Sequence, residues 1–197
     1  MPVKSKMPYN DGTYFITYTC CKWLPLIEIV QGYDIIYKGF DYLKKLGHFI
    51  NGYVIMPNHV HALISFVNHG KNLNSLIGEH KRIAAYQIIK RLKAGKKIDL
   101  LVELSDAVIQ SDIISGKNHH VWKNSFDWEF CDSVHAMDEV LNYMHQNPCS
   151  GKWNLTDKPE KYFHSSAKYY LTGVQGIYPV TNIIDLEDID LKNGHRY

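Results

Sequence analysis

The stretch GHFINGYVIMPNHVHALISFV spans residues 47–67 and decides the fold. Two runs rich in β-branched and aromatic residues flank the turn signal Pro57-Asn58, so the sequence predicts two strands here. Strands joined this closely should pair as an antiparallel hairpin. Because side chains alternate between the two faces of a strand, His59 and His61 should point the same way and Val60 the other.

Two imidazoles on one face of a strand lie about 7 Å apart and can converge on one cation. Taken alone, a His-x-His pattern is only a weak indication of a metal site. The same pattern is also what two histidines would give if they alternated in a strand by chance. A functional role for His59 and His61 therefore depends on finding further candidate residues elsewhere in the chain.

The elements around the hairpin follow a β-α-β-β-α-β order with one helix added. The other predicted elements are strands at 13–20 and 120–130 and helices at 33–46, 71–95 and 133–146. The last helix should end at Asn147, because the residue before a proline disfavours the α region. This order predicts an α+β fold, namely a ferredoxin-like (split βαβ) four-stranded antiparallel sheet with helices on one face and an additional C-terminal helix.

Length and composition favour one compact domain. The chain has 197 residues, 45% of them hydrophobic, which is enough for a sizeable core. Residues 95–118 have weaker periodicity and should form an insertion or a mobile connection. No apolar run is long enough for a membrane span, and the N-terminus lacks the apolar segment of a secretory signal. The four cysteines show no C-x-x-C spacing, so we expect a reduced, cytoplasmic protein.

The net charge of +2 conceals a basic segment between residues 71 and 97. That segment holds eight basic residues and one acid, Glu79, so its own charge is +7. A basic stripe on a nearly neutral protein is the charge pattern of a polyanion binder, although a solvated helix face gives the same pattern. The basic residues that we assign to DNA binding are Lys81, Arg82, Lys90, Arg91 and Lys93.

The predicted helix 133–146 carries further candidate residues. On a helical wheel, Tyr143 and Asn147 lie one turn apart on the flank of the apolar stripe, and His145 lies on the opposite flank. The stripe itself consists of Val134, Met137, Val140, Leu141 and Met144. A tyrosine beside such a stripe is usually a packing residue, and an asparagine before proline is usually a helix stop. Combined with two imidazoles, however, an amide oxygen and a phenol could form a metal-assisted nucleophilic site.

These motifs resemble a known family. "MPNHVHALI", then a basic helix, then "YMHQNP" is similar to the single-tyrosine HUH transposases of small bacterial insertion sequences, and among them most to the REP-associated tyrosine transposases. "YFHSSAKYY" resembles their aromatic-Ser-Ser-x-x-x-Tyr segment, and "TYFITYTC" looks like their first strand. The resemblance predicts an HUH single-tyrosine transposase domain over residues 1–171 and leaves 172–197 as a C-terminal tail.

The resemblance implies a role for each candidate residue. His59 and His61 would be metal ligands, and Asn147 would complete a site for Mg²⁺ or Mn²⁺. Gln146 is the reserve ligand, since related enzymes carry a glutamine four residues after the tyrosine and here it is three after. Tyr143 would be the nucleophile that cleaves single-stranded DNA near a hairpin, leaving a 5′-phosphotyrosine and a free 3′-hydroxyl.

The sequence leaves some alternatives open. The same fold could belong to a domesticated, non-catalytic protein that binds DNA hairpins, or to a plain metal-binding or RNA-binding protein. The presence of the whole His/His/Tyr/Asn set favours the enzyme. As a transposase the protein would be a bacterial cytoplasmic enzyme, nucleoid-associated when bound to DNA. The sequence does not decide between a monomer and a homodimer that donates the tyrosine in trans.

Overall fold

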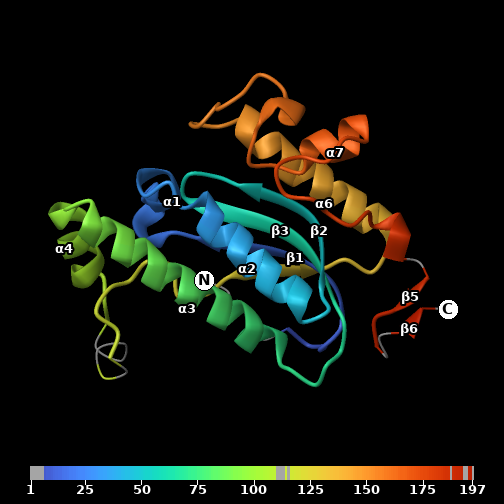
Figure 1. Cartoon of the computed structure of the whole chain (residues 1–197), viewed down its shortest axis with the longest axis horizontal. Coiled ribbons are helices and arrows are strands. Elements are labelled where there is room, and N and C mark those ends of the chain that lie inside the picture. Colours follow the sequence, from blue (N-terminus) through green and yellow to red (C-terminus); the bar gives the residue numbers. More distant parts are fainter. Residues whose placement is uncertain (1–6, 110–113, 115, 187, 193–194, 197) are drawn as a thin grey trace.

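The computed structural model describes residues 7–109, 114, 116–186, 188–192 and 195–196. A four-stranded antiparallel sheet forms its centre, in the order β2-β3-β1-β4. The strands are β1 (Gly12–Thr19), β2 (Phe49–Ile55), β3 (His59–Phe66) and β4 (Asp127–Phe130). Helices α2 (Tyr33–Lys45) and α3 (Leu73–Ala94) cover one face of the sheet, and α6 (Val134–Gln146) covers the other (Figure 1). The predicted ferredoxin-like arrangement with an added C-terminal helix is therefore confirmed.

The predicted hairpin is formed by β2 and β3. Val60 pairs with Ile55 and Ala62 pairs with Tyr53, and the backbone N–H of Met56 donates to the carbonyl of His59 at 2.8 Å. The register shifts between Ile50 and Gly52, which marks a β-bulge. Along β3, the apolar residues Val60, Ala62, Ile64 and Phe66 belong to the core under α2 and α3. His59 and His61 consequently face α6, as the alternation predicted.

The buried stripe of α3 is interrupted at one turn. Leu76, Ala84, Ile88 and Leu92 are buried, whereas Ile83 is 44% exposed. His80 takes the inward position instead, because it lies four residues before Ala84 on the same row of the helix. Its Nε2 atom is hydrogen-bonded to the hydroxyl of Tyr18 at 2.7 Å. A buried polar pair thus occupies part of the main core.

Helix α6 packs on the opposite face through a second, smaller core. Leu141 and Met144 are buried against Val54 of β2 and Leu63 of β3. Val134 was expected in this stripe but is 37% exposed, since it begins the helix beyond the edge of that core. The N-cap is Ser133, whose side chain accepts a hydrogen bond from the backbone N–H of Ala136.

The chain after α6 returns to the edge of β2 and holds the helix in place. The backbone N–H of Ile55 donates to the carbonyl of His164 at 2.9 Å, and that of Ser166 donates to the carbonyl of Tyr53 at 3.0 Å. The Ser166 hydroxyl is also hydrogen-bonded to Nε2 of His145 on α6, at 2.8 Å. The "YFHSSAKYY" segment therefore covers an exposed sheet edge and links it to α6.

The remaining segments are more ordered than predicted. Part of the expected mobile connection forms α4 (Ile98–Asp106), because Leu104 is fully buried and fixes this stretch against the core; residues 110–113 and 115 of that connection lie outside the described residues. Beyond residue 171, Tyr178 and Val180 pack into the main core. Other short elements are α1 (Leu26–Ile29), α7 (Ala167–Thr172), β5 (Ile189–Asp190) and β6 (His195–Arg196). Within the described residues, no helix combines the length and hydrophobicity that a membrane crossing requires.

Candidate active site

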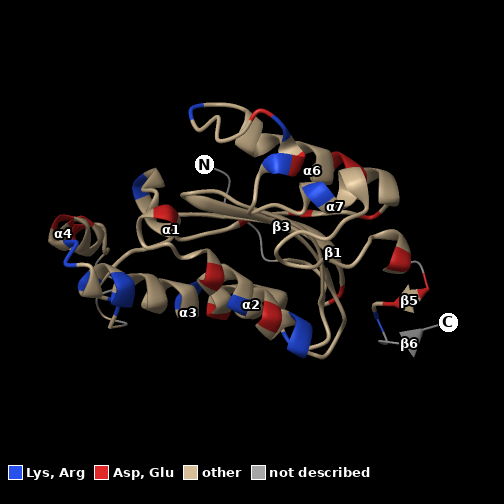
Figure 2. Cartoon of the chain, turned by 45° about the horizontal axis from the view of Figure 1, so that its top comes forward, with Lys and Arg blue, Asp and Glu red and all other residues tan. Residues whose placement is uncertain are grey.

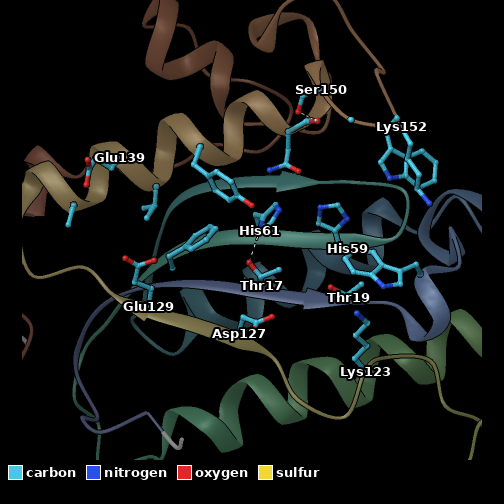
Figure 3. Close-up of a pocket in the computed structure, with 18 residues that line it drawn as sticks. Thr17, Thr19, His59, His61, Lys123, Asp127, Glu129, Glu139, Ser150 and Lys152 are labelled. Carbon is cyan, nitrogen blue, oxygen red and sulfur yellow. Dashed lines mark hydrogen bonds between the residues drawn. The ribbon is translucent and has the colours of Figure 1, made fainter. Parts of the chain in front are cut away.

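A cleft of about 840 Å³ lies between the sheet and α6. His59 and His61 of β3 and Tyr143 of α6 line it, together with Asn147, which follows the helix. The four residues that the sequence pointed to are therefore brought together in one cavity. Figure 3 shows the two histidines side by side on β3 within this cleft.

The two imidazoles are held by separate partners. Their ring centres lie 4.7 Å apart and their planes are nearly perpendicular, at 83°. Nδ1 of His61 is hydrogen-bonded to the hydroxyl of Thr17 at 2.7 Å, and Nδ1 of His59 to Oδ1 of Asn58 at 2.6 Å. Both contacts engage Nδ1 and so leave Nε2 as the nitrogen available to a cation.

Burial keeps both imidazoles neutral at physiological pH. It lowers the pKa of His59 to about 4 and that of His61 to about 3, where the neighbouring His59 acts in the same direction. The side chain of Asn147 interacts with both rings and opposes these shifts. Neutral imidazoles are the form that binds metals, and the carboxamide oxygen of Asn147, which is within reach of both rings, could act as a third donor.

Tyr143 lies at the open side of this group. Its side chain is 60% exposed, and its ring centre is 5.9 Å from that of His61. The ring of Phe15 on β1 lies 6.1 Å away and perpendicular to it, which limits how the phenol can tilt. Tyr143 therefore lines the cleft with a largely exposed side chain whose ring lies beside that of His61.

Asn147 and Gln146 differ in placement. Asn147 continues the helix with αR backbone angles, is half-buried and lines the cleft. Gln146, the reserve ligand, is exposed and is not among the residues that line the cleft. The geometry therefore favours Asn147 as the third donor.

The donor set fits a divalent cation. Two imidazole nitrogens and one amide oxygen form a mixed set that suits Mn²⁺ and leaves coordination positions for phosphate oxygens or water. In the part of the chain that is described, no third His, Cys, Asp or Glu joins His59 and His61 in a metal-sized cluster. If His59 and His61 were to hold a cation, the carboxamide of Asn147 would be the neutral side chain placed to join them.

The predicted DNA-binding residues lie elsewhere. Helix α3 packs on the face of the sheet opposite α6 (Figure 2). None of its five assigned basic residues lines the cleft. Arg82, Lys90 and Lys93 are exposed on α3. Arg91 instead donates to the carbonyl of Gln31 at 2.7 Å and forms an ion pair with Asp34 at 2.7 Å.

Lys81 is buried rather than free for a phosphate. Its ammonium donates to the carbonyls of Lys123 at 3.1 Å and Ser125 at 3.2 Å. The lysine thereby fixes the loop that precedes β4 and that delivers Lys123 to the cleft. Its expected role as a surface phosphate ligand does not fit this placement.

Several residues that shape the cleft were not predicted from the sequence. Thr17 and Asn58 hold the histidines, and Trp23 stands beside His59 with its ring centre 6.3 Å away. A signal for Thr17 was present, since alternation along "GTYFITYT" places it on the face shared by Phe15. Trp23 gave no signal, because its position depends on a turn that is distant in sequence from His59.

Charge is distributed unevenly along the cleft (Figure 3). Lys123 and Lys152 line the end at His59, Glu129 and Glu139 line the opposite end, and Asp127 lies between the two ends near Thr17. His61 and Thr17 lie between the two ends, joined by their hydrogen bond. An anionic ligand should therefore bind toward the end at His59.

One solved structure superposes on the whole of this chain. A REP-associated tyrosine transposase, solved bound to a REP hairpin, superposes with a TM-score of 0.61 and 15% sequence identity, over 100% of this chain and 99% of that chain. The fold is that of a REP-associated tyrosine transposase. The resemblance seen in the motifs therefore extends to the arrangement of the whole chain.

The other matches to known proteins are weak or absent. A protein of Deinococcus radiodurans R1 provisionally named a transposase gives a TM-score of 0.43 and 14% identity, over 74% of this chain and 97% of that one, which is too slight a likeness to bear on the fold. No protein-family model and no curated protein matches the chain. The likeness to a transposase thus lies in the fold and in short sequence motifs, not in overall sequence similarity.

Proposed function

We propose that the protein is a metal-dependent single-stranded DNA endonuclease and strand transferase that acts near DNA hairpins. The observation that carries this proposal is the exposed phenol of Tyr143 beside the paired, neutral imidazoles of His59 and His61. A phenol is a weak nucleophile at neutral pH and gains from a nearby cation that polarises the phosphate it attacks. The fold of a hairpin-bound REP-associated tyrosine transposase is consistent with this reading.

The reaction can be written as one displacement at phosphorus. The Tyr143 oxygen forms a bond to the scissile phosphorus, the bond from phosphorus to the 3′ oxygen breaks, and the phenolic proton ends on the released 3′-hydroxyl. The product is a 5′-phosphotyrosine that retains a phosphodiester bond for religation. His59, His61 and Asn147 would hold Mg²⁺ or Mn²⁺, which when bound supplies charge stabilisation to the phosphate oxygens.

The protein's own side chains set the geometry for this step. Phe15 limits the tilt of the Tyr143 ring, and Thr17 fixes the orientation of His61. Because the tyrosine and the histidines meet within a single chain, this arrangement needs no second copy to bring them together. We therefore propose cleavage in cis, whatever the oligomeric state.

Covalent capture of DNA tests the proposal. The wild-type protein, incubated with Mn²⁺ and a labelled single-stranded hairpin carrying a 3′ extension and a 5′ extension, should form an adduct that survives denaturing electrophoresis. Tyr143→Phe removes only the hydroxyl, so it should abolish the adduct and leave hairpin binding nearly unchanged. Tyr86→Phe, on the exposed side of α3, is the matched control and should form the adduct normally. An adduct that persists in Tyr143→Phe would overturn the assignment of the nucleophile.

The metal role has its own test. His59→Ala and His61→Ala should each remove metal-dependent cleavage, because one imidazole leaves too few donors to hold the cation. A chelator should have the same effect on the wild-type protein. Cleavage that continues in excess chelator contradicts the metal assignment while leaving the nucleophile assignment intact.

A further inference from the structure

We propose that Trp23, with Lys123 and Lys152, forms a subsite that holds a single DNA strand at the His59 end of the cleft, where the indole stacks on one base. This inference rests on the proposed function, since it names where the strand next to the scissile phosphate would run. Trp23 is exposed, has an unusual backbone conformation and has a cationic neighbour, and it lies at the positively charged end of the cleft.

Trp23 is a large aromatic side chain that remains 52% exposed. Its ring centre lies 6.3 Å from that of His59, with the planes at 75°. An indole in this position lies within one nucleotide's length of a phosphate bound at the histidines. Aromatic rings exposed along a groove are the usual stacking platforms for unpaired bases, because every base has a π face.

The backbone that presents Trp23 is held in an unfavourable conformation. Lys22 and Trp23 both have a positive backbone φ angle, 51° and 60°, which residues other than glycine rarely adopt. Two consecutive residues of this kind persist only where the surroundings hold them, and such places gather at ligand sites. The side-chain amide of Asn58 donates to the Trp23 carbonyl at 3.1 Å, and its Oδ1 contacts His59 at 2.6 Å. One asparagine therefore fixes both the indole segment and a candidate metal ligand.

Two lysines, Lys123 and Lys152, lie at the same end of the cleft as the indole. The ammonium of Lys123 lies 3.9 Å from the centre of the Trp23 ring, and the buried Lys81 anchors the Lys123 carbonyl. Lys152 lines the same end of the cleft. An aromatic ring with one ammonium group against it, and a second lysine at the same end of the cleft, matches a chain of bases joined by phosphates.

Acidic residues restrict the path of the strand. Glu129 and Glu139 line the far end of the cleft, and Asp127 lies between that end and Lys123. A polyanion that approaches Tyr143 therefore meets both lysines on the Trp23 side and carboxylates on the other. The geometry thus points to a strand that reaches the phenol from the side of Trp23.

Binding measurements test the subsite without relying on cleavage. All variants are made in a Tyr143→Phe background, and the probe is a fluorescein-labelled oligodeoxythymidine of about ten nucleotides, followed by anisotropy. Trp23→Ala should weaken binding about tenfold, whereas Trp23→Phe keeps a stacking ring and should stay within about threefold of the parent. Lys123→Ala should lower the slope of log Kd against log salt by about one.

Two comparisons keep the result decisive. Tyr86→Ala removes another exposed aromatic residue on the opposite face of the sheet and should bind like the parent. Thermal unfolding followed by circular dichroism identifies variants that fail to fold. Trp23→Leu keeps apolar bulk without an aromatic ring, so it replaces Trp23→Ala where the alanine variant does not fold and should also weaken binding about tenfold. The subsite is overturned if the folded Trp23→Ala or Trp23→Leu variant binds like the parent, if folded Trp23→Phe loses about tenfold in affinity, or if Tyr86→Ala weakens binding equally. A covalent adduct formed by wild-type protein in that case would leave the nuclease proposal standing.

Discussion

Thr17 and His61 face each other directly across β1 and β3, and the threonine hydroxyl lies 2.7 Å from Nδ1 of the imidazole. The contact selects which ring nitrogen points into the cleft, because a hydrogen-bonded Nδ1 leaves Nε2 for a ligand. Thr17→Val removes the hydroxyl at nearly constant shape. We expect the affinity for Mn²⁺ to fall about 10–100-fold, as when other partners of metal-bound histidines are removed. Titration calorimetry of Mn²⁺ binding measures this.

The control for Thr17 lies on the same strand. The hydroxyl of Thr13 is hydrogen-bonded to that of Ser65 at 2.7 Å, on the same face of β1 but outside the cleft. Thr13→Val should cost about 1 kcal/mol of unfolding free energy and leave Mn²⁺ affinity unchanged. Equal losses of metal affinity in the two valine variants would show that the effect is a general loosening of the sheet.

Asn147 and Gln146 are the two candidates for the third metal ligand, and their alanine variants distinguish them. Asn147 interacts with both imidazoles, whereas Gln146 is exposed away from the cleft. Asn147→Ala should weaken Mn²⁺ binding about tenfold or more and slow cleavage in parallel, because one donor is lost. Gln146→Ala should change neither quantity. The reverse pattern, measured in the same titrations, would return the role to Gln146.

The hairpin and the histidine pair could be predicted because their signals are local. Alternation along 47–67 and the Pro57-Asn58 turn fix which face His59 takes, and neither depends on distant contacts. The helix that carries Tyr143 was likewise visible from its periodicity and its end before Pro148. The four central residues of the cleft follow from these two local patterns once the sheet order is known.

The remaining features depend on tertiary contacts that no local pattern encodes. Lys81 reads as a surface cation on a helical wheel, yet the backbone carbonyls of Lys123 and Ser125 compensate for its burial. His80 displaces Ile83 from the core because Tyr18 provides a partner for its imidazole. Trp23 reaches His59 only through the turn that follows β1. In each case a hydrogen bond between distant segments determines the placement.

Gly52 allows α6 to approach the sheet closely. A Cβ atom at this position would overlap the terminal carbons of Leu141 and Met144, which sit directly above β2. Gly52→Ala should therefore cost about 1–3 kcal/mol of unfolding free energy and displace the helix that carries Tyr143. We expect slower adduct formation at unchanged hairpin affinity, measured by denaturing electrophoresis and by chemical denaturation.

Gly78→Ala is the matched control for Gly52→Ala. It lies within α3 with no atom near the position of an added Cβ, so Gly78→Ala should stabilise the protein by about 0.5–1 kcal/mol and leave adduct formation unchanged. If Gly52→Ala forms the adduct as fast as Gly78→Ala, the close approach of α6 does not matter for the reaction.

His80 should make stability depend on pH, far from the cleft. Burial lowers its pKa to about 4, below the usual 6.5, and the neighbouring Lys81 ammonium acts in the same direction. The unfolded chain thus binds a proton between pH 6.5 and 4 that the folded chain does not bind, so stability should be complete above pH 6.5 and fall as the pH drops through about 4.

The corresponding variant is His80→Gln, which keeps a polar partner for Tyr18 but cannot titrate. Wild type should lose on the order of 2–3 kcal/mol more than His80→Gln between pH 7 and 4, measured as unfolding free energy in urea at each pH. Other buried histidines contribute equally to both proteins, so the difference between the two curves isolates this one group. Parallel curves across that range would mean that the pKa of His80 is the same in the folded and unfolded chains, so that its imidazole becomes protonated in the fold without cost.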